Sequence, residues 1–518
     1  MKVSARLMTR LDGGRSASTP SLAMVAGSGV GGGDVAGNGD GGLAMRSRTS
    51  SPASLRAATS GSASASVPGS SSGAGIAVRW ATTSSNIVRD ALEAQDGWVR
   101  VELPRETGAL GGSGALSSSD EGWDVLWGDC NTVRDVMSGR RLATGARINH
   151  FRNHYELTRK DLMTKNLKAK RRMAMKAGNA VAAAYYDILP ASYALPQDYA
   201  LFLEEFRRSR GATWIMKPIA RSQGRGIFLF NKLSQVSSWR KNAPGVGAMA
   251  SSGGGSSSGV ATPAAAAAAS AGGDAYVVQQ YVTNPYLIGG KKFDLRLYVA
   301  VLSYSPLVVY VYRSGFARFS SVRFSADASE LSNSLMHLTN VAVQKKSASY
   351  AAESGAKWRL ANLKRYLLTR HSASTIDAAF ARIQELIVAS LRGVEEVIAS
   401  DKAAFELYGY DVLLDDELRP WLLEVNASPS MSAENQEDYN LKFGLISDTL
   451  ALLNLDGLLP TRYPLQVGGF DLVYWNGPPA RPDPPLLTSF LGARNDRETQ
   501  LPELLGPSYV VPMPESKF

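Results

Sequence analysis

Two stretches of low complexity divide this chain and limit how much of it can fold. Residues 1–75 and 244–273 are dominated by Gly, Ser and Ala, with almost no aromatic side chain. Such segments bury too little apolar surface to offset the entropy that is lost on ordering. We therefore expect a disordered N-terminal tail and a disordered insertion. The folded part begins near residue 76 and is long enough for a large core.

The N-terminal residues resemble a targeting sequence only in part. They contain Arg and Ser and few acids, as organellar transit peptides do, and they lack the apolar core of a secretory signal. Their many glycines argue against an amphipathic helix, so we favour a plain disordered tail. The sequence contains no run of about 18 apolar residues, so we expect no membrane span.

The charge of the chain is unevenly distributed. It carries 56 Lys and Arg against 46 Asp and Glu, a formal net charge of +10. Between residues 147 and 176, ten Lys or Arg accompany only two acids, in a stretch of mostly helical composition. A solvated helix face is one explanation, but so one-sided a bias favours an acidic partner. No nucleic-acid-binding motif accompanies the charge, so we expect no nucleic acid.

The cysteine and the first two histidines carry weak signals. Cys130 is the only cysteine, so a reducing compartment is the default, and no activating base follows it closely. An ordinary, partly buried cysteine is therefore favoured over a nucleophile. His150 and His154 have a helical metal spacing, but Arg152 lies between them and the acid of a metalloprotease motif is missing. This spacing alone does not predict a zinc site.

Strands and helices are mixed without regular alternation, which predicts an α+β fold or a complex α/β fold. A strand, a short helix and a second strand are expected within 76–101. Further strands are expected at Trp123–Trp127, Thr213–Met216, Ile227–Phe230, Tyr276–Gln280, Phe293–Val301, Leu307–Tyr312, Asp411–Leu414 and Trp421–Val425. Helices are expected within 155–185 and at Tyr199–Arg208, Leu360–His371 and Ile376–Ala399. Because a strand follows the 244–273 insertion directly, the insertion interrupts one domain rather than separating two.

Two acids and an amide lie at neighbouring strands near the end of the folded part. Residues two apart in a strand share a face, so Glu424 and Asn426 point the same way. With a tight connecting turn, Asp411 would lie opposite Leu422 and project from that face, although a nearby proline leaves the register open. Three oxygen ligands on one face suit Mg²⁺. The alternative is a hairpin whose polar residues face water, but this strand is mostly apolar, and a buried acid needs a partner.

Basic residues follow two other strands. Lys217 precedes the loop Gln223–Gly226, whose glycines would let the backbone approach phosphate oxygens. The loop is neither a Walker A motif nor a dinucleotide-binding glycine motif, so a simple hairpin turn stays open as an alternative. Lys292, Asp294 and Arg296 alternate along one strand and share a face. Charges of mixed sign on an otherwise apolar strand would suit the wall of a nucleotide cleft.

Longer blocks of the sequence occur in the order found in one enzyme family. WIMKPIARSQGRGIFLF, QQYVTNPYLIGGKKFDLRLYV, YRSGFARFS, HLTNVAVQKK and FELYGYDVLLDDELRPWLLEVNASPS resemble the tubulin tyrosine ligase-like family over about residues 76–475. The blocks RINHFRNHYELTRKDLMTKNLK and VGGFDLVYWNGPP are most similar to a ciliary polyglutamylase type within it. The Gly- and Ala-rich insertion and the long tail depart from the family.

The resemblance implies an ATP-grasp fold that holds ATP between two sheets. The expected parts are a tail at 1–75, an N-terminal subdomain with the basic helix at 76–190, a central subdomain at 191–310, a C-terminal subdomain with the metal site at 311–465 and a Pro- and Gly-rich tail at 466–518. The insertion 244–273 belongs to the central subdomain.

Matching positions imply residue roles. Lys217, Lys292 and the loop residues Gln223, Gly224, Arg225 and Gly226 would contact phosphates. Gln279, Gln280, Tyr281 and Val282 would contact adenine, and Phe293, Asp294, Thr339 and Asn340 would also meet the nucleotide. Asp411, Glu424 and Asn426 would hold magnesium, Arg318 and Lys442 would bind the incoming glutamate, and Arg296, Arg318 and Glu424 would be catalytic. Val341 and Ala342 replace the Tyr and Ser of many members, a departure that bears on amino-acid specificity.

The implied activity is ligation of free L-glutamate to glutamate side chains in acidic tubulin tails. ATP and two Mg²⁺ ions would be the cofactors, and an acyl phosphate the intermediate. The implied tail-binding residues are Arg159, Lys160, Lys165, Lys168, Lys170, Arg171 and Arg172. The resemblance also implies a cytoplasmic monomer on the cytoskeleton, at a ciliary or flagellar axoneme or basal body, with an accessory protein as an open question. The alternatives are a glycine or tyrosine ligase of this fold, a non-catalytic microtubule scaffold, and a nucleic-acid binder on charge alone.

Overall fold

The computed structural model describes residues 77–103, 122–139, 142–219, 223–236, 275–348, 357–479 and 489–518. The expected disordered tail 1–75 and insertion 244–273 lie outside these residues. Among the helices described, none is both long enough and apolar enough to cross a membrane.

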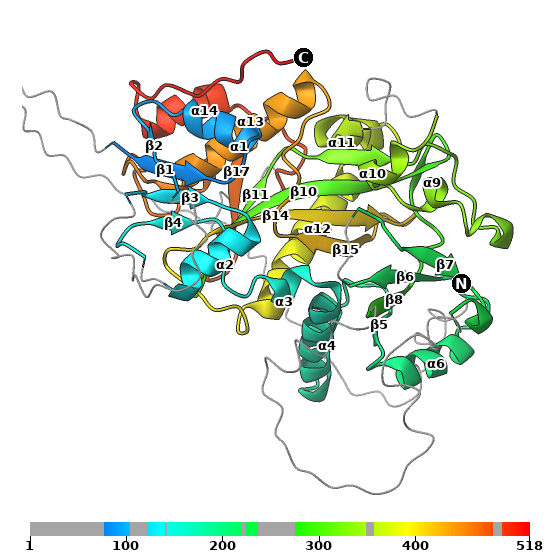
Figure 1. Ribbon diagram of the computed structural model, residues 1–518. Helices are drawn as coiled ribbons and strands as arrows, with labels where there is room; N and C mark the ends of the chain where they lie inside the picture. Colours follow the sequence, from blue (N-terminus) through cyan, green and yellow to red (C-terminus); the bar gives the residue numbers. More distant parts are fainter. Residues whose placement is uncertain are drawn as a thin grey trace, which may run out of the picture. The chain divides into compact units, whose positions relative to one another are not determined.

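The first described segments form a small parallel sheet (Figure 1). Its strands, in sheet order, are β2 (Val99–Arg100), β1 (Arg79–Thr82), β3 (Val125–Trp127) and β4 (Arg147–Ile148). Between them in the chain lie α1 (Ile87–Glu93) and α2 (Cys130–Gly139). The Asn86 side chain accepts a hydrogen bond from the Val88 amide and so begins α1. A parallel bridge between Ile148 and Ala404 joins this sheet to the segment just before β14 (Glu406–Leu414).

A second, antiparallel sheet carries the first group of predicted site residues. Its order is β5 (Ser192–Leu195), β8 (Tyr276–Gln280), β6 (Trp214–Pro218) and β7 (Phe228–Phe230). Helix α6 (Tyr199–Arg208) packs on it through Phe202, which contacts Trp214 and Phe230 edge to face. Strands β7 and β8 both pair with β6, and η1 (Leu233–Val236) follows β7. The chain between residues 236 and 275 therefore connects two strands of one sheet, as predicted.

The third and largest sheet is built around β10 (Lys291–Tyr304). One side of β10 pairs with β12 (Phe316–Phe319) and β11 (Leu307–Tyr312), and the other pairs with β14 (Glu406–Leu414), next to which lies β15 (Pro420–Asn426). The sheet is completed by β9 (Leu287–Ile288), β13 (Lys357–Arg359), β16 (Gln466–Val467) and β17 (Phe470–Trp475). The long helix α12 (Ala373–Val394) lies beside β14 and β15 in Figure 1, and its apolar residues share one core with this sheet.

The remaining helices lie between or after these strands. They are α3 (Tyr155–Thr158), α4 (Lys160–Lys176), α5 (Ala180–Tyr185), η4 (Ala328–Glu330), α9 (Ser334–His337), α10 (Val341–Gln344), α11 (Leu360–Leu368), α13 (Gln436–Leu453) and α14 (Arg497–Leu505). The helical stretch predicted at 155–185 is broken twice. Arg159 is extended, with ψ of 127°, and Gly178 has a φ of +70°. The predicted bounds of α6, β8 and β11 are confirmed.

Two expected boundaries differ from the sheet arrangement. Strand β10 was assigned to the central part, yet it pairs with β14, and the boundary at residue 310 falls inside β11. Residues 466–475 were expected to be a tail, yet β17 pairs with β11 and buries Phe470 and Leu472. The reason is hydrophobic: a strand with buried apolar side chains is more stable within a sheet than in water.

Candidate active site

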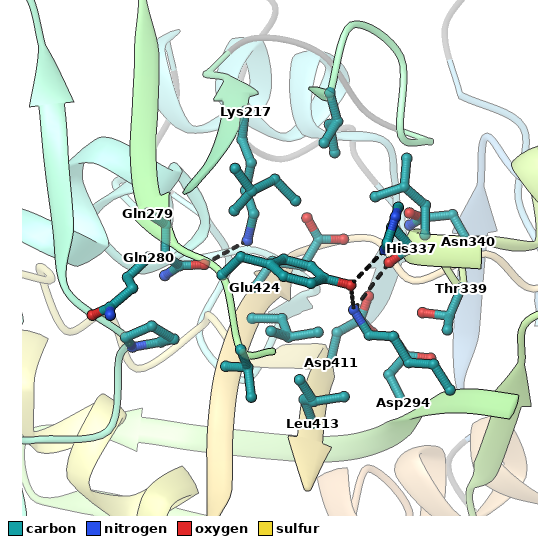
Figure 2. Close-up of a pocket in the computed structure, with 18 residues that line it drawn as sticks. Lys217, Gln279, Gln280, Asp294, His337, Thr339, Asn340, Asp411, Leu413 and Glu424 are labelled. Atoms are coloured by element: carbon teal, nitrogen blue, oxygen red, sulfur yellow. Dashed lines mark hydrogen bonds between the residues drawn. The ribbon is translucent and has the colours of Figure 1, made fainter. Parts of the chain in front are cut away.

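A pocket lies between the second and third sheets (Figure 2). The residues of the predicted nucleotide and metal sites that line it are Lys217, Gln279, Gln280, Tyr281, Val282, Lys292, Asp294, Thr339, Asn340, Asp411 and Glu424. Apolar side chains such as Ile215, Leu338 and Leu413 complete its wall. Residues from six separate segments of the sequence thus meet at one cavity with both apolar and charged surface, which is typical of a ligand site.

Two lysines at the pocket are bonded to neutral groups. The Lys217 ammonium donates to Gln279 Oε1 at 2.7 Å, and the Lys292 ammonium donates to the Tyr281 hydroxyl at 2.9 Å and the His337 carbonyl at 3.0 Å. Burial lowers the pKa of Lys217 to about 8 and that of Lys292 to about 7. An anion in the pocket would stabilise both ammonium groups and raise these pKa values.

His337 lines the same pocket, although it was not among the predicted site residues. Its Nδ1 lies 3.0 Å from the Tyr281 hydroxyl, and its Nε2 lies 3.0 Å from the Glu330 carbonyl. Because the carbonyl can only accept, Nε2 carries the proton and Nδ1 accepts from the tyrosine. Burial lowers the pKa of His337, which agrees with a neutral ring. Tyr281 is thereby held against Lys292, an interaction that the sequence did not signal.

The register of β14 and β15 differs from the prediction. Asp411 lies opposite Glu424, not Leu422, and Leu422 lies opposite Val412. Leu423 is therefore an extra residue, a β-bulge, which turns Leu422 into the core while Glu424 faces the pocket. The predicted common face is nevertheless found: Asp411 and Glu424 line the first pocket, and Asn426 follows on the same face.

Two arginines hold Asp411, one of the two acids that were predicted to bind metal. Arg296 donates to Asp411 at 2.7 Å and Arg318 at 2.8 Å, and Arg318 also donates to Asp294 at 2.9 Å. Burial alone would raise the pKa of Asp411, but the two guanidinium groups lower it well below its usual range. The donor set, two carboxylates and the amide of Asn426, is of the oxygen type that fits Mg²⁺.

Lys160 occupies a position that its predicted role did not suggest. It was expected to bind tubulin, but its ammonium lies 2.9 Å from Glu424, and only 14% of its side chain is exposed. Lys160 is the first residue of α4, so the basic helix begins at the pocket. A long-range pair of this kind, between residues 160 and 424, leaves no local pattern in a sequence.

Four other predicted tubulin-binding residues are paired with acids of the chain itself. These pairs are Arg159–Asp161, Lys168–Asp198, Lys170–Glu396 and Arg171–Asp187. Lys165 and Arg172 are exposed, and neither pairs with an acid in the part of the chain that the structure describes. Lys176 shares these properties and lies four residues after Arg172. These three residues lie on one side of α4, because they are spaced by seven and four residues.

A second pocket adjoins the first. Both are lined by Asn340 and Glu424. The cations of the second pocket are Arg296, Arg318, Lys345, Lys357 and Lys442. Val341, Ala342 and Asn426 also line it. The predicted glutamate-binding pair, Arg318 and Lys442, is therefore brought together with the predicted metal ligands.

Acids within the chain position three of these lysines. Lys442 lies 2.9 Å from Asp438, Lys357 lies 3.0 Å from the same carboxyl group, and Lys345 lies 2.9 Å from Glu434. Lys345 and Lys357 were not predicted as site residues. Lys345 lies within the block HLTNVAVQKK, so the family resemblance could have indicated it as a site residue. Lys357 is brought to the pocket only by the pairing of β13 with β12, which the sequence does not reveal.

The glycine-containing loop lies beside Asn340. Gln223, Gly224 and Gly226 have φ values of +61°, +75° and +73°, a conformation that glycine adopts readily. A Cβ atom at Gly224 would come within 2.8 Å of the Val343 side chain, so only glycine fits. Gln223 lines the second pocket, whereas Gly224, the exposed Arg225 and Gly226 line neither pocket.

Phe293 was predicted to meet the nucleotide, but it does not line the pocket. Its ring lies in the core, 5.3 Å from the ring of Phe319 and 6.3 Å from that of Tyr286. The reason is strand alternation: Lys292 and Asp294 point to the pocket, so the residue between them points to the opposite face.

Comparisons with known proteins agree with this geometry. A model of the "Tubulin-tyrosine ligase family" matches residues 140–462. The chain is 42% identical over 444 residues to "Probable tubulin polyglutamylase TTLL9" of Rattus norvegicus, which covers 82% of this chain and 92% of the rat protein. It is 39% identical over 376 residues to "Probable alpha-tubulin polyglutamylase Ttll1" of Tetrahymena thermophila, covering 68% and 86%. Similarity on this scale shows that the chain belongs to the tubulin-tyrosine ligase family.

Proposed function

We propose that this chain is a tubulin polyglutamylase, an ATP- and Mg²⁺-dependent ligase that adds glutamate to glutamate side chains of tubulin tails. The observation that carries the proposal is the pair of adjoining pockets. One combines an apolar wall with two buried lysines, and the other gathers five cations. The shared residues Asn340 and Glu424 lie where a nucleotide in the first pocket and a carboxylate in the second would approach each other. The relatives named above as polyglutamylases support the same reaction.

The proposed chemistry proceeds in two steps. A carboxylate oxygen of the acceptor attacks the γ-phosphorus of ATP, which releases ADP and leaves an acyl phosphate. The amino nitrogen of free glutamate then attacks the acyl carbon and loses a proton, an amide bond forms, and phosphate leaves. Lys217 and Lys292 would hold the phosphates, because both lysines line the first pocket. Fixed positive charge of this kind stabilises the transition state of phosphoryl transfer.

The residues that would hold magnesium are Asp411, Glu424 and Asn426. When bound, the metal would neutralise charge on the transferring phosphoryl group. Lys160, Arg296 and Arg318 balance the two carboxylates in the structure. Lys160 would pair with Glu424 when the site is empty and with a phosphate oxygen when nucleotide is bound. The charge of the site would then be balanced in both states.

The second pocket would bind the incoming amino acid. Arg318 and Lys442 are the predicted partners of glutamate, and we add Lys345 and Lys357 because their ammonium groups line the same space. A dicarboxylate needs more positive charge than glycine or tyrosine does, which favours glutamate. Cytoskeletal association follows from a tubulin substrate. The resemblance to a ciliary type supports axonemal or basal-body microtubules as the place of action.

The test is incorporation of labelled glutamate, glycine and tyrosine, each offered separately to microtubules with the full chain and Mg-ATP. We expect incorporation of glutamate alone. Glycine or tyrosine incorporation would assign a different substrate to the same fold. Calorimetric ATP binding without any incorporation would instead favour a scaffold or an enzyme that requires an accessory protein.

The exposed cations of α4 would steer the acidic tubulin tail. Replacing Lys165, Arg172 and Lys176 together by Glu is expected to weaken microtubule binding about 10-fold or more at low salt, since long-range charge attraction raises the association rate. ATP affinity should not change, because these side chains lie outside both pockets. Cosedimentation measures the first quantity and calorimetry the second.

A matched control changes the net charge equally at another surface. Arg207 on α6, Arg210 just after it and Lys232 just after β7 are exposed. If their reversal weakened microtubule binding as much as reversal on α4, net charge rather than the helix would govern binding. Unchanged affinity after reversal on α4 would contradict the proposed role of that helix.

A further inference from the structure

A cluster of metal-binding side chains lies outside both pockets. Cys130 at the start of α2, and His150 and His154 before α3, bring their ligand atoms within 4.8 Å of one another. Cys130 Sγ is 3.6 Å from His150 Nε2. The Ser428 hydroxyl lies 3.7 Å from the same sulfur and 3.4 Å from the same nitrogen. Three separate segments of the chain thus converge on one point.

The orientation of His150 is fixed from behind. Its Nδ1 lies 2.6 Å from Glu406 Oε1, and the other oxygen of that carboxyl group accepts the Phe151 amide at 2.9 Å. Both His150 and Glu406 are buried. A carboxylate that holds one ring nitrogen, and so aims the other at the ligand, is the usual arrangement behind a metal-bound histidine.

The spacing suits a small tetrahedral ion. Zinc binds sulfur at about 2.3 Å and imidazole nitrogen at about 2.0–2.1 Å, so the two atoms lie roughly 3.5–3.6 Å apart around a tetrahedral ion. The distance from Cys130 Sγ to His150 Nε2 matches this edge. One thiolate and two imidazoles favour zinc, whereas the oxygen set at Asp411 and Glu424 favours magnesium.

We propose that Cys130, His150 and His154 bind one zinc ion. The fourth position would be filled by the Ser428 hydroxyl or by water. Binding would tie α2 and the segment before α3 to the chain after β15, where Ser428 follows the predicted magnesium ligand Asn426 by two residues. The site therefore has a stabilising role that does not depend on the proposed ligase reaction.

The sequence pointed away from this site for an identifiable reason. The metal-binding helix of a metalloprotease has an acid between its two histidines, and the sequence between His150 and His154 has none. In the structure both residues precede α3, and the third ligand comes from a helix twenty residues earlier in the chain.

The experiment uses the full chain, purified without a histidine tag, in buffer containing excess Mg²⁺. We expect one zinc per chain by mass spectrometry of the metal. We also expect protection of the thiol from alkylation by iodoacetamide, which reports on this site alone because Cys130 is the only cysteine. Cobalt in place of zinc should give a thiolate-to-metal charge-transfer band.

Cys130→Ser should abolish the cobalt band and weaken zinc binding by more than the 10–100-fold that is typical for a residue that only orients a ligand. His154→Ala, at a half-buried position, should also lose stoichiometric zinc while folding is checked by circular dichroism. His371→Ala is the control, because that residue lies outside the cluster.

Two results would overturn the proposal. If both variants bound zinc as tightly as wild type, the metal would lie elsewhere. If wild type bound none at excess zinc, and its thiol were alkylated equally fast with and without the metal, the cluster would be a thiolate–imidazolium pair without a metal. Neither result bears on glutamate incorporation, so failure here is distinguishable from failure of the proposed function.

Discussion

Glu424→Gln is expected to lower glutamate incorporation into microtubules by roughly 100-fold or more, since loss even of groups that support a metal ligand costs about 10–100-fold. The change keeps the size of the side chain and removes its charge. It removes the negative partner of Lys160 and one of the two carboxylates predicted to hold magnesium. Initial rates with labelled glutamate, at several Mg²⁺ and ATP concentrations, measure the loss. A rate that recovers partly at high Mg²⁺ would indicate weakened metal binding.

The matched control is Glu417→Gln. Glu417 carries the same charge in the turn of the same hairpin, but its side chain is exposed and lines neither pocket. Its variant should retain the wild-type rate. Full activity of Glu424→Gln would exclude this carboxylate from catalysis and would leave Lys160 without a role at the site.

Arg318→Met is expected to lower the free energy of unfolding by about 3–5 kcal/mol and to abolish glutamate incorporation, since loss of one partner leaves a buried charge uncompensated. Arg318 is 6% exposed and bonds to both Asp294 and Asp411. Without it, Asp294 loses the guanidinium with which it pairs, and Asp411 keeps Arg296. Urea unfolding followed by tryptophan fluorescence measures the stability, and labelled glutamate measures the activity.

The stability difference should depend on pH in a defined direction. The arginines lower the folded-state pKa of Asp411, so their stabilisation is complete above the unfolded-state value of about 4. It is lost as the pH falls from there towards the lowered folded-state pKa. Wild type and Arg318→Met should therefore approach each other in stability in acid. A constant difference would mean that packing, not charge, accounts for the effect.

Arg313→Met separates stability from activity. Arg313 is also buried and donates two hydrogen bonds of 2.7 Å to Asp471, but it lines neither pocket. Its variant should lose similar stability and keep glutamate incorporation per folded molecule. If Arg318→Met kept its activity as well, Arg318 would have a structural role only.

The sequence predicted what local patterns encode. Strands β8 and β11 are short runs rich in β-branched and aromatic residues, and α6 has an amphipathic pattern, so their bounds agree with the structure. Helix α13 was missed because it is buried on nearly every side and has no polar face to give a period. The alternation of Lys292, Asp294 and Arg296 correctly placed three charges on one face of β10.

The long-range contacts of the site could not be predicted in this way. Three contacts join residues that are distant in sequence. Lys160 pairs with Glu424, β13 pairs with β12 and so brings Lys357 to the second pocket, and Glu406 contacts His150. Each depends on which elements pack together, and a single sequence carries no period or spacing that reports it. The resemblance of whole blocks identified the family, but the structure was needed to show that Lys160 pairs with Glu424 at the edge of the pocket.

The bulge at Leu423 has a genetic consequence. Leu422 and Glu424 lie two residues apart yet face opposite sides of the sheet, because the bulge interrupts the alternation of β15. An in-frame loss of the Leu423 codon would make β15 regular, with the acid directly after Leu422, so the acid would still lie opposite Asp411 and face the pocket. A regular strand that kept Leu423 would instead pair the acid with Tyr410 and turn it towards the core. A relative that lacks one residue here is therefore not marked as a pseudoenzyme by that gap, as long as it keeps all three ligands.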